Sequence, residues 1–253
     1  MSKKQMWLIS IVIYAFIVFF AGALLARQAL DDRHSAAAFE LVAALVVDEP
    51  AEETAAPQMT PYEKYKDAHA RNSDMIGWVR IEGTNINYPV MQTLDRPDFY
   101  LKHSFEKLGS DYGVPYVAEH CALGICDNTI IYGHHMKDGS MFSDLCKYTD
   151  KAFYEGHKTI QFDTLDEYGT YEIAAVFKTT VYDDVGFKFY QFTRAQDAED
   201  FDAYLYQCQQ LALYDTGVSA KYGDKLITLS TCEYSQENGR MVVVAKKVES
   251  TGE

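Results

Sequence analysis

The chain has 253 residues, of which 48% are apolar and 24% charged, and this balance excludes disorder over most of the length. It carries 37 acidic against 23 basic residues, a formal charge of −14, and no cluster of Lys and Arg that would hold a phosphate backbone. We therefore expect no nucleic-acid partner, and the length favours one folded domain with appendages.

The first predicted element is an apolar helix near the N-terminus. Met6 to Ala26 is an uncharged run of 21 residues. A helix of this length reaches about 31 Å, which matches a hydrocarbon core of about 30 Å. Lys3 and Lys4 precede it and favour a cytoplasmic N-terminus, with the rest of the chain outside the cell. A cleaved signal peptide is the alternative, although its apolar region is usually only about 7–15 residues long.

Two segments follow this predicted anchor. Ala29 to Val47 is rich in Ala and predicts a helical stalk, whereas Asp48 to Pro61 is acidic, contains Pro and lacks aromatic residues. Such a composition buries no core and predicts a linker. We expect residues 1–27 to form the cytoplasmic tip and transmembrane signal anchor, 28–60 the stalk and acidic linker, and 61–253 the folded domain.

The folded part is predicted to be mainly β with added helices. Pro61 begins a short helix, and Gly77 marks the change to strands. Short runs of strand-forming residues then recur between turn residues, at 77–81, 86–92, 128–133, 158–164, 170–181, 225–232 and 240–248. Seven or eight such strands indicate a barrel or a sandwich.

A longer helix interrupts the late strands. Thr193 and Gln196 have the spacing of a capping box, which predicts the start of this helix. Apolar residues then recur with a period of 3.6 and predict a packed face, formed by Phe201, Tyr204, Leu205, Cys208, Leu211 and Ala212.

Cysteine usage indicates a reactive thiol. The chain has five cysteines, an odd number that leaves at least one unpaired if all bridges are intramolecular: Cys121, Cys126, Cys146, Cys208 and Cys232. Cys121 and Cys126 could form a disulfide, but the sequence does not fix their oxidation state. A zinc site at His120, Cys121, Cys126, His134 and His135 would have suitable ligand types, yet the spacing matches no regular zinc motif, and we expect no metal.

Two motifs supply the groups that thiol catalysis needs. A cysteine attacks a carbonyl as its thiolate, and an imidazole must exchange protons with the thiol and the leaving group. His134 follows a strand and Gly133, where side chains often reach an open edge. In LITLSTCEYSQENGRMVVV, Cys232 and Arg240 can share one face of two antiparallel strands, where the guanidinium can stabilise an oxyanion.

These motifs carry a family resemblance. The membrane anchor, IYGHHM, and TLSTCEY with an Arg eight residues beyond the Cys resemble the class B sortases, the cysteine transpeptidases of Gram-positive bacteria. The resemblance covers about Pro61 to Val248, and the helix between the late strands resembles the class B elaboration of the sortase barrel.

The resemblance implies an eight-stranded sortase β-barrel with His134, Cys232 and Arg240 as catalytic residues. It implies cleavage after Thr in the C-terminal sorting motif of a surface protein, a thioester on Cys232, and transfer to an amine of peptidoglycan precursor. His134 is preferred to His135 because the family's catalytic His directly follows the Gly. By motif position Ser230 and Glu233 flank the substrate groove, and no metal or cofactor is implied.

Two other functions remain open from the sequence. A secreted papain-like or cell-wall thiol hydrolase would also use Cys and His, but those families place Cys before His, whereas His134 precedes Cys232. A surface adhesin would need no coupled Cys, His and Arg.

Overall fold

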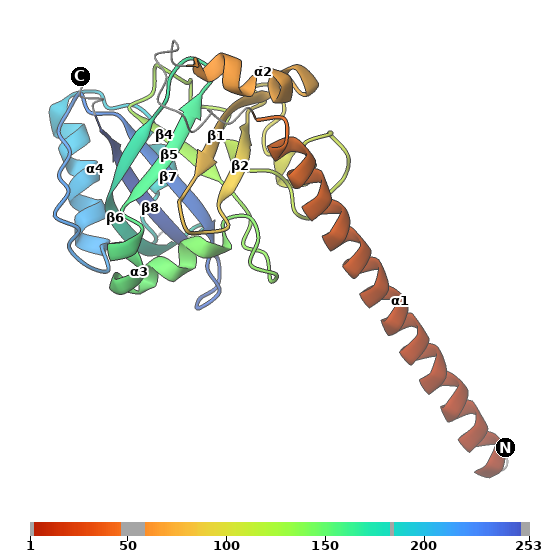
Figure 1. Cartoon of the computed structure of the whole chain (residues 1–253). Helices are drawn as coiled ribbons and strands as arrows, with labels where there is room; N and C mark the ends of the chain where they lie inside the picture. Colours follow the sequence, from red (N-terminus) through yellow and green to blue (C-terminus); the bar gives the residue numbers. More distant parts are fainter. Residues whose placement is uncertain (1–2, 47–58, 183–184, 249–253) are drawn as a thin grey trace. The chain divides into compact units, whose positions relative to one another are not determined.

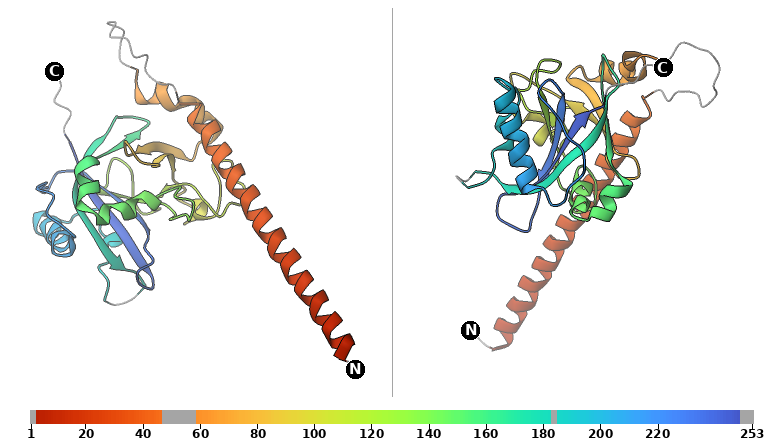
Figure 2. Two further views of the ribbon diagram at one scale, coloured as in Figure 1. Left: turned by 60° about the horizontal axis from the view of Figure 1, so that its bottom comes forward. Right: turned by 90° about the vertical axis from the view of Figure 1, so that its left-hand side faces the viewer.

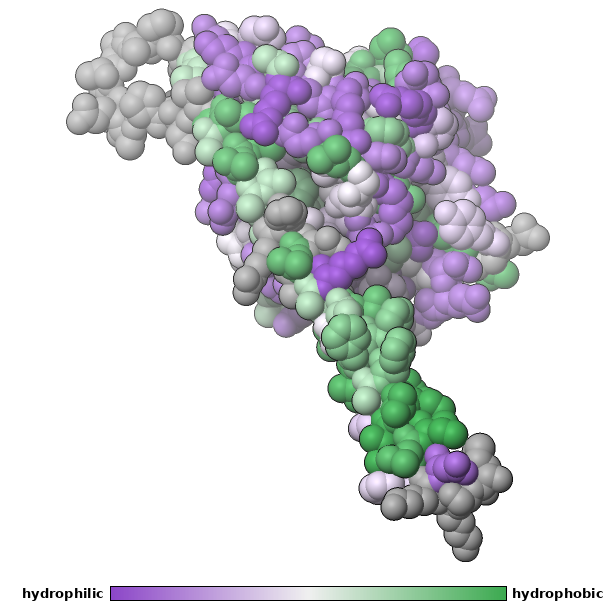
Figure 3. Space-filling view, turned by 90° about the vertical axis from the view of Figure 1, so that its right-hand side faces the viewer, coloured by the Kyte–Doolittle hydropathy of each residue, from purple (hydrophilic) through white to green (hydrophobic). Residues whose placement is uncertain are grey.

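The computed structural model describes residues 3–46, 59–182 and 185–248, and the chain divides into two compact units, Met1–Leu41 and Val42–Glu253. Helix α1 (Lys3–Ala43) continues through the predicted anchor into the predicted stalk (Figure 1). Its stretch Gln5–Arg27 is long and apolar enough to cross a membrane, and Figure 3 shows a band of apolar side chains along it. Most of the predicted linker lies outside the described residues.

The second unit contains a closed barrel of eight strands, which confirms the predicted fold. The strands pair in the order β1-β2-β3-β4-β7-β8-β6-β5. Their bounds are β1 (Met75–Arg80), β2 (Asn87–Met91), β3 (Tyr116–Val117), β4 (Asn128–Tyr132), β5 (Thr159–Thr164), β6 (Thr170–Thr180), β7 (Leu226–Cys232) and β8 (Gly239–Lys247). The pairs β2–β3 and β4–β7 are parallel, and the other neighbours are antiparallel.

The helices of this unit pack around the barrel (Figure 2). Helix α2 (Pro61–Arg71) begins with a capping box, in which Thr60 and Glu63 satisfy each other's backbone N–H groups, and with Pro at its first turn. The shorter helices in the described part of this unit are α3 (Lys151–Gly156) and the 3₁₀ turns η1 (Phe99–Leu101), η2 (Ser143–Thr149) and η3 (Phe189–Gln191).

Helix α4 (Ala198–Leu211) is the predicted helix between the late strands, but it begins later than predicted. Asp197 caps it by accepting a hydrogen bond from the N–H of Asp200, so the capping box at Thr193 and Gln196 was the wrong start. The predicted apolar face is confirmed along most of its length, because Phe201, Tyr204, Leu205 and Cys208 are buried.

Buried polar groups tie α4 to the barrel. The Asn128 side chain on β4 donates to the carbonyl of Phe192 at 2.9 Å and accepts from the Thr228 hydroxyl on β7 at 2.8 Å. The Tyr204 hydroxyl lies 3.4 Å from that of Thr228. Because these groups satisfy one another away from water, they fix β4 and β7 side by side at the start of their parallel pairing.

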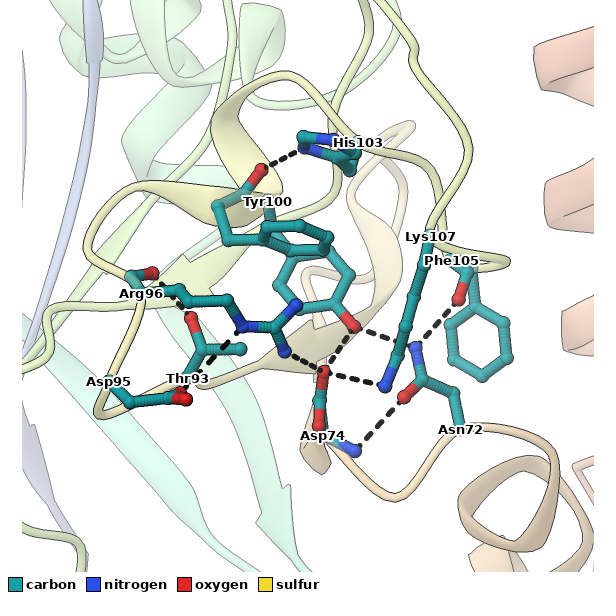
Figure 4. A network of polar contacts seen from close by, with 10 residues as sticks. Asn72, Asp74, Thr93, Asp95, Arg96, Tyr100, His103, Phe105 and Lys107 are labelled. Carbon is teal, nitrogen blue, oxygen red and sulfur yellow. Dashed lines mark hydrogen bonds and ion pairs between the residues drawn. The ribbon is translucent and has the colours of Figure 1, made fainter.

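A second polar network, drawn in Figure 4, fixes the turn η1. The Asp74 carboxylate accepts from the Tyr100 hydroxyl at 2.8 Å and lies 2.9 Å from the Lys107 ammonium. Partial burial raises the pKa of Asp74, but the hydrogen bonds from Lys107 and Tyr100 outweigh this and lower it. Asn72 donates to the Tyr100 hydroxyl at 2.7 Å, so the ring and the η1 backbone are held from two sides.

Candidate active site

Strand register brings the two predicted motifs together. Cys232 is the last paired residue of β7, and it lies directly opposite Arg240 on β8. On the other side of β7, Tyr132 of β4 pairs in parallel with Ser230, and the N–H of Gly133 donates to the Ser230 carbonyl at 3.1 Å. The chain that leaves β4 therefore passes beside the end of β7. His134, two residues beyond Tyr132, is thereby placed near Cys232, two residues beyond Ser230.

A cavity of about 300 Å³ opens at this end of the barrel. It is lined by the three predicted catalytic residues and by Ser230, together with Asp98, Leu101, Tyr116, Ala118, Glu119, His120, Tyr132, Gly133, Val181, Tyr182, Phe189, Tyr190 and Thr231. The structure thus brings His134, Cys232, Arg240 and Ser230 to one cavity, as expected if they act together.

His134 is held by Leu101, the last residue of η1. Its Nε2 lies 2.7 Å from the carbonyl oxygen of Leu101, so this nitrogen carries the hydrogen and donates. Burial lowers the pKa of His134, and the hydrogen bond to Leu101 raises it in part. A largely neutral imidazole at neutral pH can take a proton from a thiol.

Gly133 allows His134 to lie this close to the barrel. A Cβ at Gly133 would stand 2.5 Å from the ring of Phe142, which is fully buried. Any larger residue would push the chain away from Phe142. The glycine in the GHH motif therefore has a packing cause, in addition to its place in the family pattern.

Two contacts position the guanidinium of Arg240, the residue opposite Cys232 in the sheet. Its Nη1 donates to the carbonyl of Gly239 at 2.9 Å, and the guanidinium carbon lies 5.9 Å from the centre of the Tyr182 ring. Both Arg240 and Cys232 are partly exposed at the cavity, so a substrate can reach them. A fixed cation opposite a thiol can stabilise the oxyanion that forms when the thiolate attacks a carbonyl.

Two residues that line the cavity have hydroxyl groups without partners in the described structure. The side-chain oxygens of Ser230 and Thr231 are buried and form no hydrogen bond. A buried hydroxyl without a partner costs free energy, and a bound peptide could supply the missing partner. Ser230 was predicted from its motif position, whereas Thr231 was missed although it lies in the same motif.

Glu233 does not line the cavity. Its carboxylate lies 3.0 Å from the Lys178 ammonium on β6 and accepts from the Ser235 hydroxyl at 2.6 Å. Partial burial raises the pKa of Glu233, and the bonds from Ser235 and Lys178 lower it more. In this structure the side chain holds the turn between β7 and β8, and its predicted role in substrate binding remains a prediction.

The remaining lining residues were not predicted from the sequence. Asp98, Glu119, His120 and Tyr182 come from segments that are far apart in the chain and carry no shared motif. Barrel closure brings them together. Asp98 accepts from the Tyr116 hydroxyl at 2.7 Å, and burial together with this contact raises the pKa of Tyr116, so the phenol stays a neutral donor.

The cysteines are all free thiols in the structure. Cys121, Cys126 and Cys208 are buried, whereas Cys146 and Cys232 are partly exposed. Across residues 3–46, 59–182 and 185–248, no group of three or more His, Cys, Asp or Glu is placed to hold a metal ion.

Comparison with known proteins identifies relatives of this chain. Residues 79–248 match the model of the Sortase domain family. Sortase B of Listeria monocytogenes is 39% identical over 191 residues, which cover 74% of each protein. Sortase B of Staphylococcus aureus is 31% identical over 251 residues, which cover 96% of this chain and 97% of that protein.

Solved structures of sortase B share the fold. A substrate complex of the Staphylococcus aureus protein superposes with a TM-score of 0.69 at 31% identity, covering 77% of this chain and 88% of that chain. A complex of sortase B with triglycine superposes with a TM-score of 0.70 at 31% identity, covering 77% of this chain and 89% of that chain.

Proposed function

We propose that this chain, which belongs to the class B sortases and is thus a cysteine transpeptidase, cleaves the C-terminal sorting motif of surface proteins after Thr. It then transfers the acyl group to an amine of peptidoglycan precursor. The observation that carries this proposal is the cavity that His134, Cys232 and Arg240 line together. The solved sortase B complexes with substrate and with triglycine support a peptide donor and an amine acceptor.

The residues act in two half-reactions. His134 first takes the proton of the Cys232 thiol, and the resulting thiolate attacks the Thr carbonyl carbon while Arg240 stabilises the oxyanion. The protonated His134 then gives this proton to the leaving amine as the C–N bond breaks. The resulting thioester is then attacked by the acceptor amine, which gives a proton to His134. The C–S bond breaks, a new amide forms, and the Cys232 thiolate is restored.

Substrate contacts are proposed for the groove beside the nucleophile. The free hydroxyls of Ser230 and Thr231 can bond peptide groups that enter the cavity. Glu233 is partly exposed while it is paired with Lys178, and we propose that its carboxylate accepts a hydrogen bond from the peptide at the edge of the groove.

The transferase reaction is tested by measuring how the acyl group divides between an added amine and water. We expect purified enzyme, given a library of fluorogenic pentapeptides that contain Thr, to form a triglycine adduct when triglycine is added. Hydroxylamine, a stronger nucleophile, should capture the thioester and raise turnover several-fold above plain hydrolysis. Mass spectrometry identifies the products. Products of hydrolysis alone, at every amine concentration, would favour the thiol-hydrolase alternative.

We also propose that α1 anchors the enzyme in the cell membrane with residues 61–253, the sortase catalytic domain, outside the cytoplasm. The support is the apolar stretch Gln5–Arg27 of α1. We expect the full chain to sediment with membranes and a variant lacking residues 1–27 to remain in the soluble fraction. Protease added to intact cells should digest the domain, and a domain protected until lysis would contradict this topology.

A further inference from the structure

A second histidine lies behind the nucleophile. His135 directly follows His134, but its side chain does not line the cavity. Its Nδ1 lies 3.0 Å from the backbone carbonyl oxygen of Cys232. The proposed reaction does not use His135, so this contact needs another explanation.

The direction of this hydrogen bond follows from its partners. A carbonyl oxygen can only accept, so the hydrogen sits on Nδ1 of His135. The Cys146 sulfur on η2 lies 3.4 Å from the same nitrogen and 3.9 Å from the same carbonyl oxygen. The imidazole is therefore held between η2 and the end of β7.

The His135 ring takes the place of a missing backbone donor. Carbonyl groups two residues apart on a strand point to the same side. The Ser230 carbonyl points toward β4 and accepts from the N–H of Gly133. The Cys232 carbonyl points the same way, but β4 has ended at Tyr132, and the donor there is the His135 side chain.

The His135 backbone is itself fixed. It forms an antiparallel bridge with Met141, and the N–H of Phe142 donates to the His134 carbonyl at 2.8 Å. The Tyr234 hydroxyl donates to the His135 carbonyl at 3.3 Å, and the centres of the two rings lie 5.0 Å apart. A side chain on such a fixed loop can restrain the strand end that it contacts.

We propose that His135 is a positioning residue for the transpeptidase reaction. Its Nδ1–H bond to the Cys232 carbonyl fixes the last residue of β7 and so holds the thiol in line with His134 and Arg240. This role rests on the proposed function, because it presupposes that Cys232 is the nucleophile of that reaction. The same two neighbouring histidines thus divide the work: His134 exchanges protons, and His135 holds the nucleophile's backbone.

Two amide variants separate this role from simple packing. In the full-length enzyme in detergent, His135→Asn places an amide N–H near the position of Nδ1, whereas His135→Gln places it near Nε2. Misplacing a reacting group by about 1 Å can cost ~10²-fold in rate. We expect His135→Gln and His135→Ala to lower kcat about 10- to 100-fold with little change in KM, and His135→Asn to retain most of kcat.

A second measurement does not depend on the peptide. The rate at which iodoacetamide alkylates Cys232, followed by mass spectrometry of the Cys232 peptide, should fall in His135→Gln and His135→Ala and recover in His135→Asn. Thermal unfolding of each variant shows whether it is folded. Equal kcat and equal alkylation in folded Asn and Gln variants would overturn the proposal. If the wild type cleaves no peptide of the library, the proposed function fails, and the alkylation rates still decide the role of His135.

Discussion

Replacing Cys232 with Ala will abolish both cleavage and transfer. The side chain is the thiol among the residues lining the cavity, and without it no thioester can form. Cleavage of the fluorogenic library should fall to background, and the hydroxamate product should disappear.

Cys208→Ala is the matched control for this loss. Cys208 is buried in α4, outside the cavity, and its removal should cost about 1–3 kcal/mol of stability while the activity of the folded protein is kept. An enzyme that still forms an acyl adduct without Cys232, or a folded Cys208→Ala protein that forms none, would show that the nucleophile is wrongly assigned.

Replacing Arg240 with Ala will remove most of the oxyanion stabilisation. The loss of one oxyanion donor typically costs ~10²–10³ in kcat, or about 2.7–4 kcal/mol. Arg240→Lys should recover only part of the rate, because an ammonium lacks the planar fork of the guanidinium. Steady-state kinetics on a cleaved library peptide gives kcat and KM for each variant.

Arg71 provides a matched control for Arg240. It forms a surface ion pair with Glu106 at 2.7 Å, outside the cavity, and such pairs contribute only about 0–1 kcal/mol. Arg71→Ala should therefore leave kcat unchanged. The double variant Cys232→Ala/Arg240→Ala should be no less active than Cys232→Ala, because the residues act as one unit. A kcat for Arg240→Ala within a few-fold of wild type would remove Arg240 from the reaction.

Most of the barrel could be predicted from local patterns. Strands β6, β7 and β8 are long and rich in β-branched and apolar residues. Their predicted ends therefore agree with the observed ends to within a residue or two. The two-residue strand β3 could not be found, because Tyr116 and Val117 are too short a run to show any period. The start of α4 was missed because Thr193 offered a false capping box, while Asp197 is the residue that caps.

The site was predictable only where its residues share a motif. His134, Cys232 and Arg240 stand beside the ends of strands that pair, so their meeting follows from the motif and the register. Glu119 and Tyr182 reach the cavity from separate loops, and only the closed barrel shows this. The contact between His135 and the Cys232 carbonyl likewise depends on where β4 ends, which the sequence places only approximately.

The parallel pairing of β4 with β7 also determines when the enzyme becomes reactive. The ribosome releases the chain from its N-terminus, so β4 emerges long before β7 and β8, the last strands of the barrel. Pairings between such distant segments form slowly, because closing the long intervening loop costs conformational entropy. His134 therefore has neither the thiol of Cys232 nor the guanidinium of Arg240 beside it until nearly the whole protein has been synthesised. A truncated or stalled chain that ends before Leu226 lacks the nucleophile altogether and cannot acylate its surroundings.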